Sequence, residues 1–240
     1  IYSSCCACEH DIRFDKHNHN LIMDEREAMS MIDFKLKHYQ NILDTEGYKG
    51  SSDIVMCFTD YPTFRHEIFT EYKLNRISKR KPLGLGAVIK EVKNNYESIS
   101  YPNLEGDDVL GLLSTNNKYD NPVIVSVDKD MKTIPGLLLA GDTLELITRT
   151  QADKHFMAMT IAGDATDGVP GIKGLGMVSA TKILDSAKDL ASMWDLVVKT
   201  YNKKGNGISD AILNARLVRI LREGDYDYNT GEVRLWNPTF

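Results

Sequence analysis

The chain has 240 residues, of which 42% are hydrophobic and 26% charged, as expected of a globular protein with a substantial core. Its formal net charge of −5 argues against a generally basic surface of the kind that coats nucleic acids. No apolar run approaches the roughly 20 residues that a bilayer span needs and no signal peptide is visible, so we expect a cytoplasmic protein without a membrane partner.

The N-terminal region concentrates candidate zinc ligands. A usual structural zinc site combines two separated ligand pairs, and the spacing here is too tight for that pattern. We therefore favour a helix start that carries small residues, followed by a polar loop at 15–20, and keep zinc as the alternative. With Cys57 in an apolar run, the cysteines form a poor disulfide framework, as in a reducing compartment. The residues behind the zinc alternative are Cys5, Cys6, Cys8, His10, His17 and His19.

An amphipathic helix and a short strand follow. Apolar residues recur at spacings of three and four over 24–43, which predicts a helix with one buried stripe. A turn at 51–53 leads to the apolar run 54–58, which predicts a buried strand. Asp60 comes just past the end of that strand, where open α/β sheets bind ligands, so it is a candidate metal ligand, with a helix cap as the alternative.

The segment 64–82 is the most basic stretch of the chain. Tyr72 precedes Lys73, and Arg76 follows one helical turn later, so cations for phosphates stand beside an aromatic ring that could stack on a base. A solvated charged helix is the alternative interpretation. The basic residues are Arg65, Lys73, Arg76, Lys79, Arg80 and Lys81.

Acidic residues gather at the ends of the next predicted elements. After a helix over 83–96, a second helix at 104–113 opens with acids at 105, 107 and 108. Capping explains one or two of these, but three within a turn repel one another unless a cation lies among them. A strand over 123–127 then ends in Asp128 and Asp130, which would point the same way if the strand continued.

A glycine-rich stretch at 163–176 follows two short predicted strands, at 137–140 and 144–148, and a helix at 151–162. Its two acids are three residues apart and project from one face if the helix continues into them. Glycines and a proline then forbid a regular helix before the pattern at 177–184. A glycine-rich turn that enters a helix presents unpaired backbone N–H groups to a phosphate. An ordinary surface loop is the alternative. The acids are Asp164 and Asp167.

The C-terminal region is predicted to be mostly helical. One helix covers 187–198, with Trp194 in the core, and a second is capped by Ser209 and extends to residue 223. Residues 232–236 predict a last strand. The second helix carries basic residues at a spacing of three, which form either an exposed face or a track for phosphates. They are Arg216, Arg219 and Arg222.

Together, the acids predict a metal centre. So many carboxylates could not stay ionised close together without divalent cations, and all-oxygen ligands suit Mg²⁺ or Mn²⁺. Two such ions drive attack of water on a phosphodiester, so we predict hydrolysis of nucleic acid. The eight candidate ligands are Asp60, Glu105, Asp107, Asp108, Asp128, Asp130, Asp164 and Asp167.

These motifs resemble those of the flap endonuclease family of 5′ nucleases, which includes the 5′-nuclease domain of bacterial DNA polymerase I. LEGDDV at 104–109, VDKD at 127–130 and GDATDGVPGIKGLG at 163–176 are similar to its acidic motifs and its helix–three-turn–helix element. FTD at 58–60 and EYKLNR at 71–76 are similar to its second-strand acid and its helical-arch motif. The endings RILR and LWNP, at 219–222 and 235–238, are similar to the 5′-to-3′ exonuclease of lytic tailed bacteriophages.

The resemblance implies a fold class and a domain plan. The fold is α/β: a mixed, mostly parallel central sheet flanked by helices (the PIN-like 5′-nuclease fold), with a helical arch and a helix–three-turn–helix DNA-binding element. A single 5′-nuclease domain would span 1–240. Within it, 1–167 would be mainly the catalytic core, 62–82 the arch, and 163–223 the helix–three-turn–helix and helical region.

The resemblance also implies residue roles. Two metal ions would bind, the first cluster being Asp60, Glu105, Asp107 and Asp108 and the second Asp128, Asp130, Asp164 and Asp167. Carbonyls of the glycine-rich turn would hold K⁺. The catalytic residues would be Lys73, Arg76, Asp107 and Asp130. The DNA-binding residues would be Tyr72, Lys73, Arg76, Lys79, Arg80, Lys81, Gly168, Gly171, Lys173, Gly174, Gly176 and Lys182.

Two departures from the family pattern are visible. The family's first strand, with an Asp at its end, has no counterpart, because the sequence begins with Ile1 where that strand should finish. We therefore expect a further N-terminal segment in the gene product. Cellular members often place basic residues near positions at which this chain has Met159 and Val178. Lys154, Lys173 and Lys182 are candidates to contact phosphates instead.

The predicted function is a divalent-metal-dependent 5′-to-3′ exonuclease or flap endonuclease that acts on DNA at 5′ ends, gaps or flaps, with some activity on RNA in hybrids. We expect a monomer in the host cytoplasm that works beside replication proteins. Two alternatives stay open: a non-catalytic binder of DNA structures with the same fold, and a PIN-like ribonuclease. Which of exonuclease and flap cleavage predominates is also open.

Overall fold

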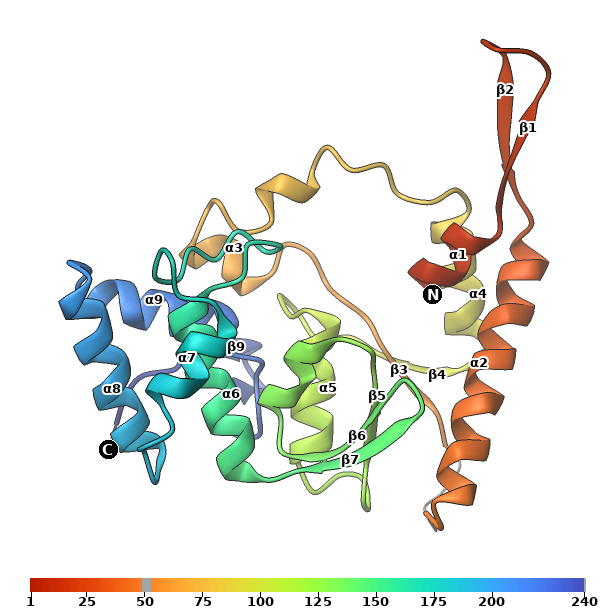
Figure 1. Cartoon of the computed structure of the whole chain (residues 1–240). Coiled ribbons are helices and arrows are strands. Elements are labelled where there is room, and N and C mark those ends of the chain that lie inside the picture. The colour runs from red at the N-terminus through yellow and green to blue at the C-terminus, as the bar shows by residue number, and fades with distance from the viewer. Residues whose placement is uncertain (49–52, 240) are drawn as a thin grey trace. The chain divides into compact units, whose positions relative to one another are not determined.

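The computed structural model describes residues 1–48 and 53–239, which form two compact units (Figure 1). Unit 1 comprises Ile1–Met56 and Ser78–Ile99, and unit 2 comprises Cys57–Ile77 and Ser100–Phe240. The turn predicted at 51–53 lies mostly outside the described residues. Among those that are described, no helix combines the length and the apolar composition that crossing a membrane requires.

Unit 1 is built from three helices, a hairpin and a small sheet. Helices α1 and α4 both pack against α2, whose first turn is capped by the Asp24 carboxylate accepting from the Arg26 N–H at 2.8 Å. Cys5 and Cys8 are fully buried here, which agrees with the structural interpretation of the N-terminus. The elements are α1 (Tyr2–Ala7), β1 (Glu9–Arg13), β2 (His19–Met23), α2 (Glu25–Thr45), β3 (Val55–Cys57), α4 (Leu85–Asn95) and β4 (Glu97–Ile99).

The hairpin of β1 and β2 corrects the sequence analysis, which predicts only a polar loop at 15–20. That loop is the tip of an antiparallel pair in which Glu9 lies opposite Met23 and Arg13 opposite His19. Both strands are largely exposed, and neither alternates between apolar and polar residues in the way by which a strand is detected in sequence. The base of the hairpin is fixed by Glu9, whose two oxygens accept from Arg80 at 2.6 Å each.

Unit 2 contains a three-stranded sheet that is smaller than the central sheet predicted. β5 (Val123–Val125) is parallel to β6 (Gly136–Ala140), and β6 is antiparallel to β7 (Thr143–Ile147). β3 pairs with β4 rather than with β5, so the described strands form four small sheets instead of one mostly parallel sheet. β5 is short because the chain leaves the sheet at residue 126 and turns into the 3₁₀ helix η2 (Lys129–Thr133).

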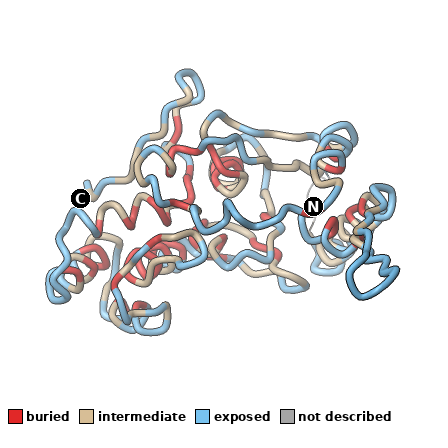
Figure 2. Tube along the Cα trace, turned by 90° about the horizontal axis from the view of Figure 1, so that it is seen from above, coloured by how far each residue is buried: buried red, intermediate tan, exposed pale blue. Residues whose placement is uncertain are grey.

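Helix α6 (Arg149–Ala162) is the centre of the helical part of unit 2. It begins at a capping box formed by Thr148 and Gln151, and α7, α8 and α9 pack around it (Figure 1). Because α6 has neighbours on several sides, it is buried nearly all round. Figure 2 shows that many of the buried residues of the chain lie on helices. The remaining helices are α3 (Phe64–Ile68), η1 (Leu74–Arg76), α5 (Gly106–Thr115), α7 (Met177–Ile183), α8 (Leu190–Lys203) and α9 (Ile208–Val218).

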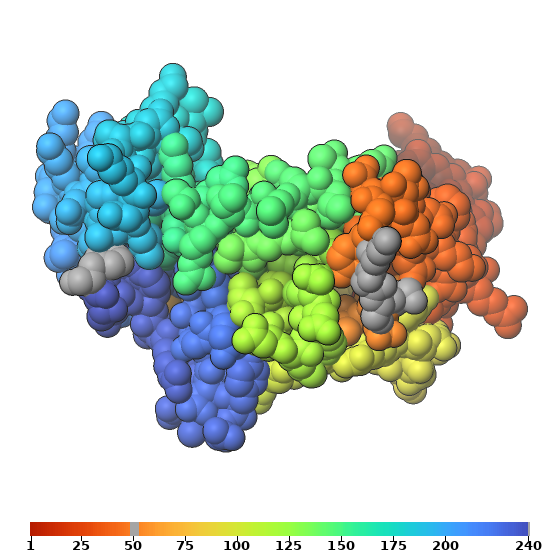
Figure 3. All heavy atoms as spheres, turned by 90° about the horizontal axis from the view of Figure 1, so that it is seen from below, coloured from red at the N-terminus to blue at the C-terminus, as the bar shows by residue number. Residues whose placement is uncertain are grey.

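The C-terminal segment packs on this helical core. Trp236 contacts Trp194 and Phe156 with ring centroids 4.9 and 5.4 Å apart, so Trp194 is a core residue as predicted. Figure 3 shows the C-terminal atoms, in dark blue, against those of the helices in cyan and lighter blue. The strand predicted at 232–236 is reduced to β9 (Glu232–Val233), which pairs with β8 (Tyr226–Asp227).

Two predictions for the last helix are wrong. Its N-cap is Gly207, whose N–H donates to Asp210 at 3.0 Å, rather than Ser209, and the helix ends at Val218 instead of residue 223. Its three arginines form neither an exposed face nor a phosphate track, because internal acceptors occupy their side chains. Arg216 donates to the Trp236 carbonyl, Arg219 pairs with Asp225, and Arg222 pairs with Asp153.

Candidate active site

Five of the eight predicted metal ligands line one cavity of unit 2. They come from three separate segments of the chain. Arg65, Tyr72 and hydrophobic side chains of α6, of the glycine-rich stretch, of α9 and of the residues after α9 form the rest of the wall. The cavity holds about 30 Å³, room for one or two water-sized groups. The five acids are Glu105, Asp107, Asp130, Asp164 and Asp167.

The start of α5 presents the first two acids. Glu105 is the N-cap of the helix and Asp107 lies in its first turn, where the helix dipole favours negative charge. The start of α5 lies close to the residues at the end of β3 and just after it. The Gly106 N–H donates to Thr59 Oγ1 at 2.9 Å, and a Cβ on Gly106 would lie 3.1 Å from the Cys57 carbonyl oxygen. Glycine at 106 therefore allows the first turn of α5 to pack against this segment.

Asp130 reaches the cavity from η2, so the strand does not continue through the two acids, the condition under which they would point the same way. The Asp128 carboxylate caps η2 and accepts from the Asp130 N–H at 2.9 Å. The two acids therefore do not alternate along a strand: Asp128 is exposed and holds the turn, while Asp130 is half-buried at the cavity.

The glycine-rich stretch supplies Asp164 and Asp167 just after α6. Gly163 ends that helix with φ 70°, and the chain folds back so that Asp164 and Val169 exchange two backbone hydrogen bonds at 2.9 and 2.8 Å. A Cβ on Gly171 would overlap the Ala162 carbonyl, so this return requires glycine. The helix thus ends at Ala162, as predicted, and does not continue into the acids, which a tight turn presents instead.

The segment around η1 lies along this turn. The Lys73 N–H donates to the Asp167 carbonyl at 2.9 Å, and the Asn75 side chain donates to the carbonyls of Ala165 and Thr166 at 3.2 Å each. A Cβ on Gly168 would lie 3.1 Å from the Glu71 carbonyl oxygen, so these two backbones are in close contact. Together, these contacts carry basic side chains to the acids.

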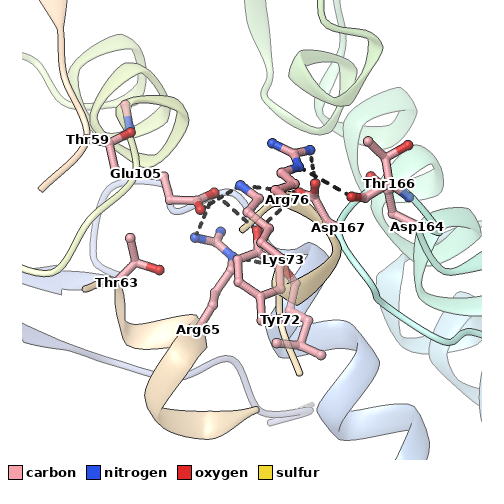
Figure 4. A network of polar contacts seen from close by, with 12 residues as sticks. Thr59, Thr63, Arg65, Tyr72, Lys73, Arg76, Glu105, Asp164, Thr166 and Asp167 are labelled. Atoms are coloured by element: carbon pink, nitrogen blue, oxygen red, sulfur yellow. Dashed lines mark hydrogen bonds and ion pairs between the residues drawn. The ribbon is translucent and has the colours of Figure 1, made fainter. Parts of the chain in front are cut away.

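Lys73 and Arg76 lie among the carboxylates, and Arg65 lies beside Glu105 (Figure 4). The Lys73 ammonium is 2.6 Å from Glu105 Oε1 and 3.4 Å from Asp167 Oδ2, and the Arg76 guanidinium pairs with the other oxygen of Asp167. The Tyr72 hydroxyl lies 3.2 Å from one oxygen of Glu105 and 3.2 Å from one of Asp167, and these two acceptors share its single proton. Because Tyr72 is only 3% exposed, its ring does not offer the open stacking surface that the sequence predicts.

The acids perturb one another's protonation. Burial, and then the charges of Glu105 and Asp108, raise the pKa of Asp107 to about 7. Burial and the charge of Asp128 raise the pKa of Asp130 to about 6. Burial opposes ionisation of Glu105 as well, but Arg65 and Lys73 outweigh it and lower the pKa of that carboxyl. Burial and the neighbouring carboxylates therefore favour the protonated forms of Asp107 and Asp130, and a bound cation would favour the ionised forms.

The chemistry of these donors fits divalent cations. Carboxylate oxygens are the ligands that Mg²⁺ and Mn²⁺ prefer, and burial together with neighbouring carboxylates raises the pKa values of Asp107 and Asp130. In the part of the chain that the structure describes, no three acidic, His or Cys side chains are already grouped as a metal would hold them. Lys73 and Arg76 provide the positive charge instead.

Comparison with known proteins identifies the chain. The family described as 5′-3′ exonuclease, N-terminal resolvase-like domain, matches residues 14–160. The chain belongs to this family of 5′-3′ exonucleases. It is 28% identical to the exonuclease of Escherichia phage T7 over 274 residues, which cover 99% of this chain and 90% of that protein. The flap endonuclease Xni of Shewanella oneidensis is 27% identical, with 75% of this chain and 76% of that protein covered.

Solved structures agree on the fold of this nuclease. The bacteriophage T5 D15 flap endonuclease, in a pseudo-enzyme–product complex with DNA and metal ions, matches with a TM-score of 0.53. The sequences are 15% identical, and the match covers 76% of this chain and 78% of that one. A second T5 D15 structure, co-crystallised with metal ions, matches with a TM-score of 0.54 and 16% identity over 76% of this chain and 80% of that one. The overall 5′-nuclease fold implied by the sequence motifs is therefore confirmed, while the helical arch and the helix–three-turn–helix stay predictions.

Three predicted ligands of the exonuclease do not line the cavity. Asp60 is exposed and accepts from the Asn103 N–H at 3.2 Å, and Asp128 is exposed as the cap of η2. Asp108 is completely buried and paired with Arg65 at 2.6 Å. Of the three acids at 105–108, only Glu105 and Asp107 line the cavity, because Asp108 faces the interior of unit 2.

The predicted DNA-binding residues fall into separate groups. Gly168 and Gly171 are half-buried and serve the backbone contacts of the glycine-rich turn, whereas Tyr72, Lys73 and Arg76 are engaged at the cavity. Arg80 is held by Glu9 in unit 1, where Lys79 and Lys81 also lie. Lys154 pairs with Asp185 at 2.6 Å. The predicted DNA-binding residues that are exposed on the turn and on α7 are Lys173, Gly174, Gly176 and Lys182.

Two buried side chains of the site were not singled out from sequence. Arg65 was counted only as part of the basic stretch, although it is 2% exposed. Asn214 is 2% exposed on α9, and its amide oxygen accepts from the Gly171 N–H at 2.9 Å, which fixes the turn that follows the acids. A polar Asn among apolar residues of a helix is the signal that could have revealed it.

The raised pKa values predict how the metal-free protein responds to pH. Asp107 and Asp130 hold protons more tightly when folded than when unfolded, so the unfolded chain binds fewer protons between about pH 4 and pH 7. The free energy of unfolding therefore falls as the pH rises through this window, by on the order of 2 kcal/mol for the coupled pair. We expect the unfolding temperature in EDTA to be lower at pH 8 than at pH 5.5.

This dependence is measured with tryptophan fluorescence, because both tryptophans, Trp194 and Trp236, belong to unit 2. Mg²⁺ added at pH 8 should restore the unfolding temperature, since cation binding requires the ionised carboxylates. Asp130→Asn should flatten the pH dependence in EDTA. An unfolding temperature that rises between pH 5.5 and pH 8 in EDTA would contradict the prediction.

Proposed function

We propose that the chain is a divalent-metal-dependent 5′-to-3′ exonuclease and flap endonuclease. It hydrolyses DNA phosphodiester bonds at 5′ ends, gaps or flaps, and it has some activity on the RNA strand of RNA–DNA hybrids. The convergence of five acids from three separate segments on one cavity, with Lys73 among them, carries this proposal. The T5 flap endonuclease, whose fold is shared, was solved with DNA and metal ions.

The carboxylates of the cavity would hold two Mg²⁺ or Mn²⁺ ions, and Asp60 and Asp128 remain predicted ligands that do not line the cavity wall. When bound, such ions lower the pKa of water to supply hydroxide and neutralise charge on the scissile phosphate. Glu105 and Asp167 are paired with Lys73 in the structure, and a bound metal ion would take the place of that partner. The hydrophobic residues of the wall, Met159 and Val169 among them, limit access of bulk water.

Lys73 and Arg76 would act on the substrate. Each is a strong donor, and the side chains are 13% and 43% exposed, so both keep access to solvent while they face the carboxylates. A phosphate brought to the cavity would accept their hydrogen bonds in place of Glu105 and Asp167. In that position they stabilise the negative charge that develops on the phosphate during attack.

The glycine-rich turn and α7 would hold the duplex. Lys173 and Lys182 are exposed there, and the turn presents Gly174 and Gly176 without side chains to a passing backbone. A K⁺ ion bound by carbonyls of the turn would strengthen this contact. Lys79, Arg80 and Lys81 remain predicted contacts of the arch at 62–82. We further predict a monomer that acts in the host cytoplasm beside replication proteins.

The test is cleavage of 5′-labelled substrates with Mg²⁺, with Mn²⁺ and with EDTA. Blunt, nicked, gapped and flapped duplexes, with an RNA–DNA hybrid as a further arm, are compared by the length of the released product. Release of short 5′ products that requires a divalent cation supports the proposal. Binding of the same substrates without any cleavage would support the non-catalytic alternative, and cleavage confined to single-stranded RNA would support the ribonuclease.

Lys73→Met is expected to reduce the rate of cleavage about 100-fold, because it removes one donor to the developing charge. DNA binding should weaken far less. The matched control is Lys132→Met, which breaks a surface ion pair with Glu145 at 2.8 Å and should leave cleavage within about twofold of the unmodified protein. Single-turnover rates on a flapped duplex measure both variants. Equal rates for the two would remove Lys73 from the catalytic residues.

A further inference from the structure

Arg65 and Asp108 form an ion pair that solvent does not reach. Their side chains are 3% and 0% exposed. Arg65 Nη1 donates to Asp108 Oδ2 at 2.6 Å, and Nη2 donates to Oδ1 at 2.8 Å. The guanidinium and the carboxylate thus meet along two parallel hydrogen bonds, the arrangement in which this pair is most specific in geometry.

The other lone pairs of Asp108 are also used. Oδ1 accepts from the Leu221 N–H, and Oδ2 accepts from the Glu105 N–H, each at 3.2 Å. Each carboxylate oxygen has two acceptor positions, so these four donors occupy the whole carboxylate. A metal ion could bind Asp108 only by displacing a buried donor, which would then lose its partner.

The other donors of Arg65 tie α5 to the end of α9. Nε donates to the Leu217 carbonyl at 2.8 Å, and Nη2 donates to the Arg219 carbonyl at 2.6 Å. Nη1 lies 3.7 Å from Glu105 Oε2. The contact between α5 and this segment is tight, because a Cβ on Gly111 would overlap the Leu221 carbonyl oxygen. Arg65 therefore joins the acidic turn to a fixed part of unit 2.

We propose that Asp108 and Arg65 are positioning residues for the metal centre and that Asp108 is not a metal ligand. Through Arg65, Asp108 fixes the first turn of α5 so that Glu105 and Asp107 face the cavity. The inference rests on the proposed function, and it changes the ligand set that the sequence motif predicts. From sequence, Arg65 counts only as one cation of a basic stretch that could contact DNA. We infer that it instead supports the site from inside unit 2.

Unfolding in EDTA at pH 8 separates a ligand from a positioning residue without any metal. Asp130→Asn removes one of several repelling carboxylates and should raise the unfolding temperature of unit 2, read from tryptophan fluorescence. Asp108→Asn and Arg65→Gln each leave a buried charge without its partner and should lower it by more than about 5 °C. Their double variant should lose less than the sum of the two.

Mn²⁺ binding, followed by calorimetry well below the unfolding temperature and without DNA, completes the test. Asp108→Asn and Arg65→Lys should bind as many ions as the unmodified protein, with a dissociation constant about 10-fold higher. Asp130→Asn should bind fewer ions, and if it does not, the proposed function fails rather than this inference. Loss of an ion from Asp108→Asn, an unfolding temperature at or above that of the unmodified protein, or an unchanged dissociation constant would overturn the inference.

Discussion

Replacement of Asp130 by asparagine is expected to slow cleavage of a 5′-flapped duplex by on the order of 1000-fold, since Asp130 is a proposed metal ligand and such a ligand contributes several kcal/mol to the transition state. Asparagine keeps the shape of the side chain and one acceptor oxygen, so η2 and the cavity should persist. Affinity for the duplex, measured by fluorescence anisotropy in Ca²⁺, should stay within about threefold, because the exposed lysines and the glycine-rich turn are unchanged. Single-turnover rates in Mg²⁺ give the comparison.

The matched control for this substitution is Asp195→Asn, which makes the same chemical change at an exposed position of α8. It should leave both cleavage and binding as they are. Full activity of Asp130→Asn would remove the assignment of the cavity as the active site. Loss of binding together with cleavage would show that Asp130 serves the DNA contact rather than the chemistry.

The elements that the sequence predicts well are those with one buried face or a strong end signal. The helix at 24–43 appears as α2, and the helix at 83–96 appears as α4, because apolar residues mark a single face in each. The hairpin of β1 and β2 was missed for the opposite reason, since neither strand has a buried face. The division into two units could not be predicted either, because no linker-like composition marks the points near residues 57, 77 and 100 at which the chain passes from one unit to the other.

The acids of the site could be predicted because their residue type and local spacing carry the signal. Their partners could not, because the ion pairs join residues that are far apart in the chain. Glu105 finds Lys73 32 residues away, and Asp108 finds Arg65 43 residues away. A run of acids in sequence therefore does not reveal which members meet a cation of the protein. Asp107 and Asp108 are adjacent, yet one faces the cavity and the other the interior.

The partners of Arg222, near the C-terminus, are also far from it in the chain. Arg222 is 3% exposed, and it donates to Asp153 Oδ1 at 2.6 Å and, through Nε, to the Thr133 carbonyl at 3.1 Å. Burial, followed by the charge of Arg219, lowers its pKa to about 10, so it stays charged at neutral pH. It thereby links α6 to the end of η2, the element that presents Asp130.

Arg222→Met is expected to lower the free energy of unfolding of unit 2 by about 3–5 kcal/mol, because the buried carboxylate of Asp153 and the Thr133 carbonyl lose their donors. Urea unfolding at pH 7.5, followed by fluorescence of Trp194 and Trp236, measures it. Arg234→Met is the matched control: its pair with Asp227 spans 3.2 Å, the arginine is 62% exposed, and the loss should stay below about 0.5 kcal/mol. Arg222→Met combined with Asp153→Leu should recover part of the stability, since no unpaired charge remains. Equal losses for the two single arginine variants would show that the Arg222–Asp153 pair does not hold η2 against α6.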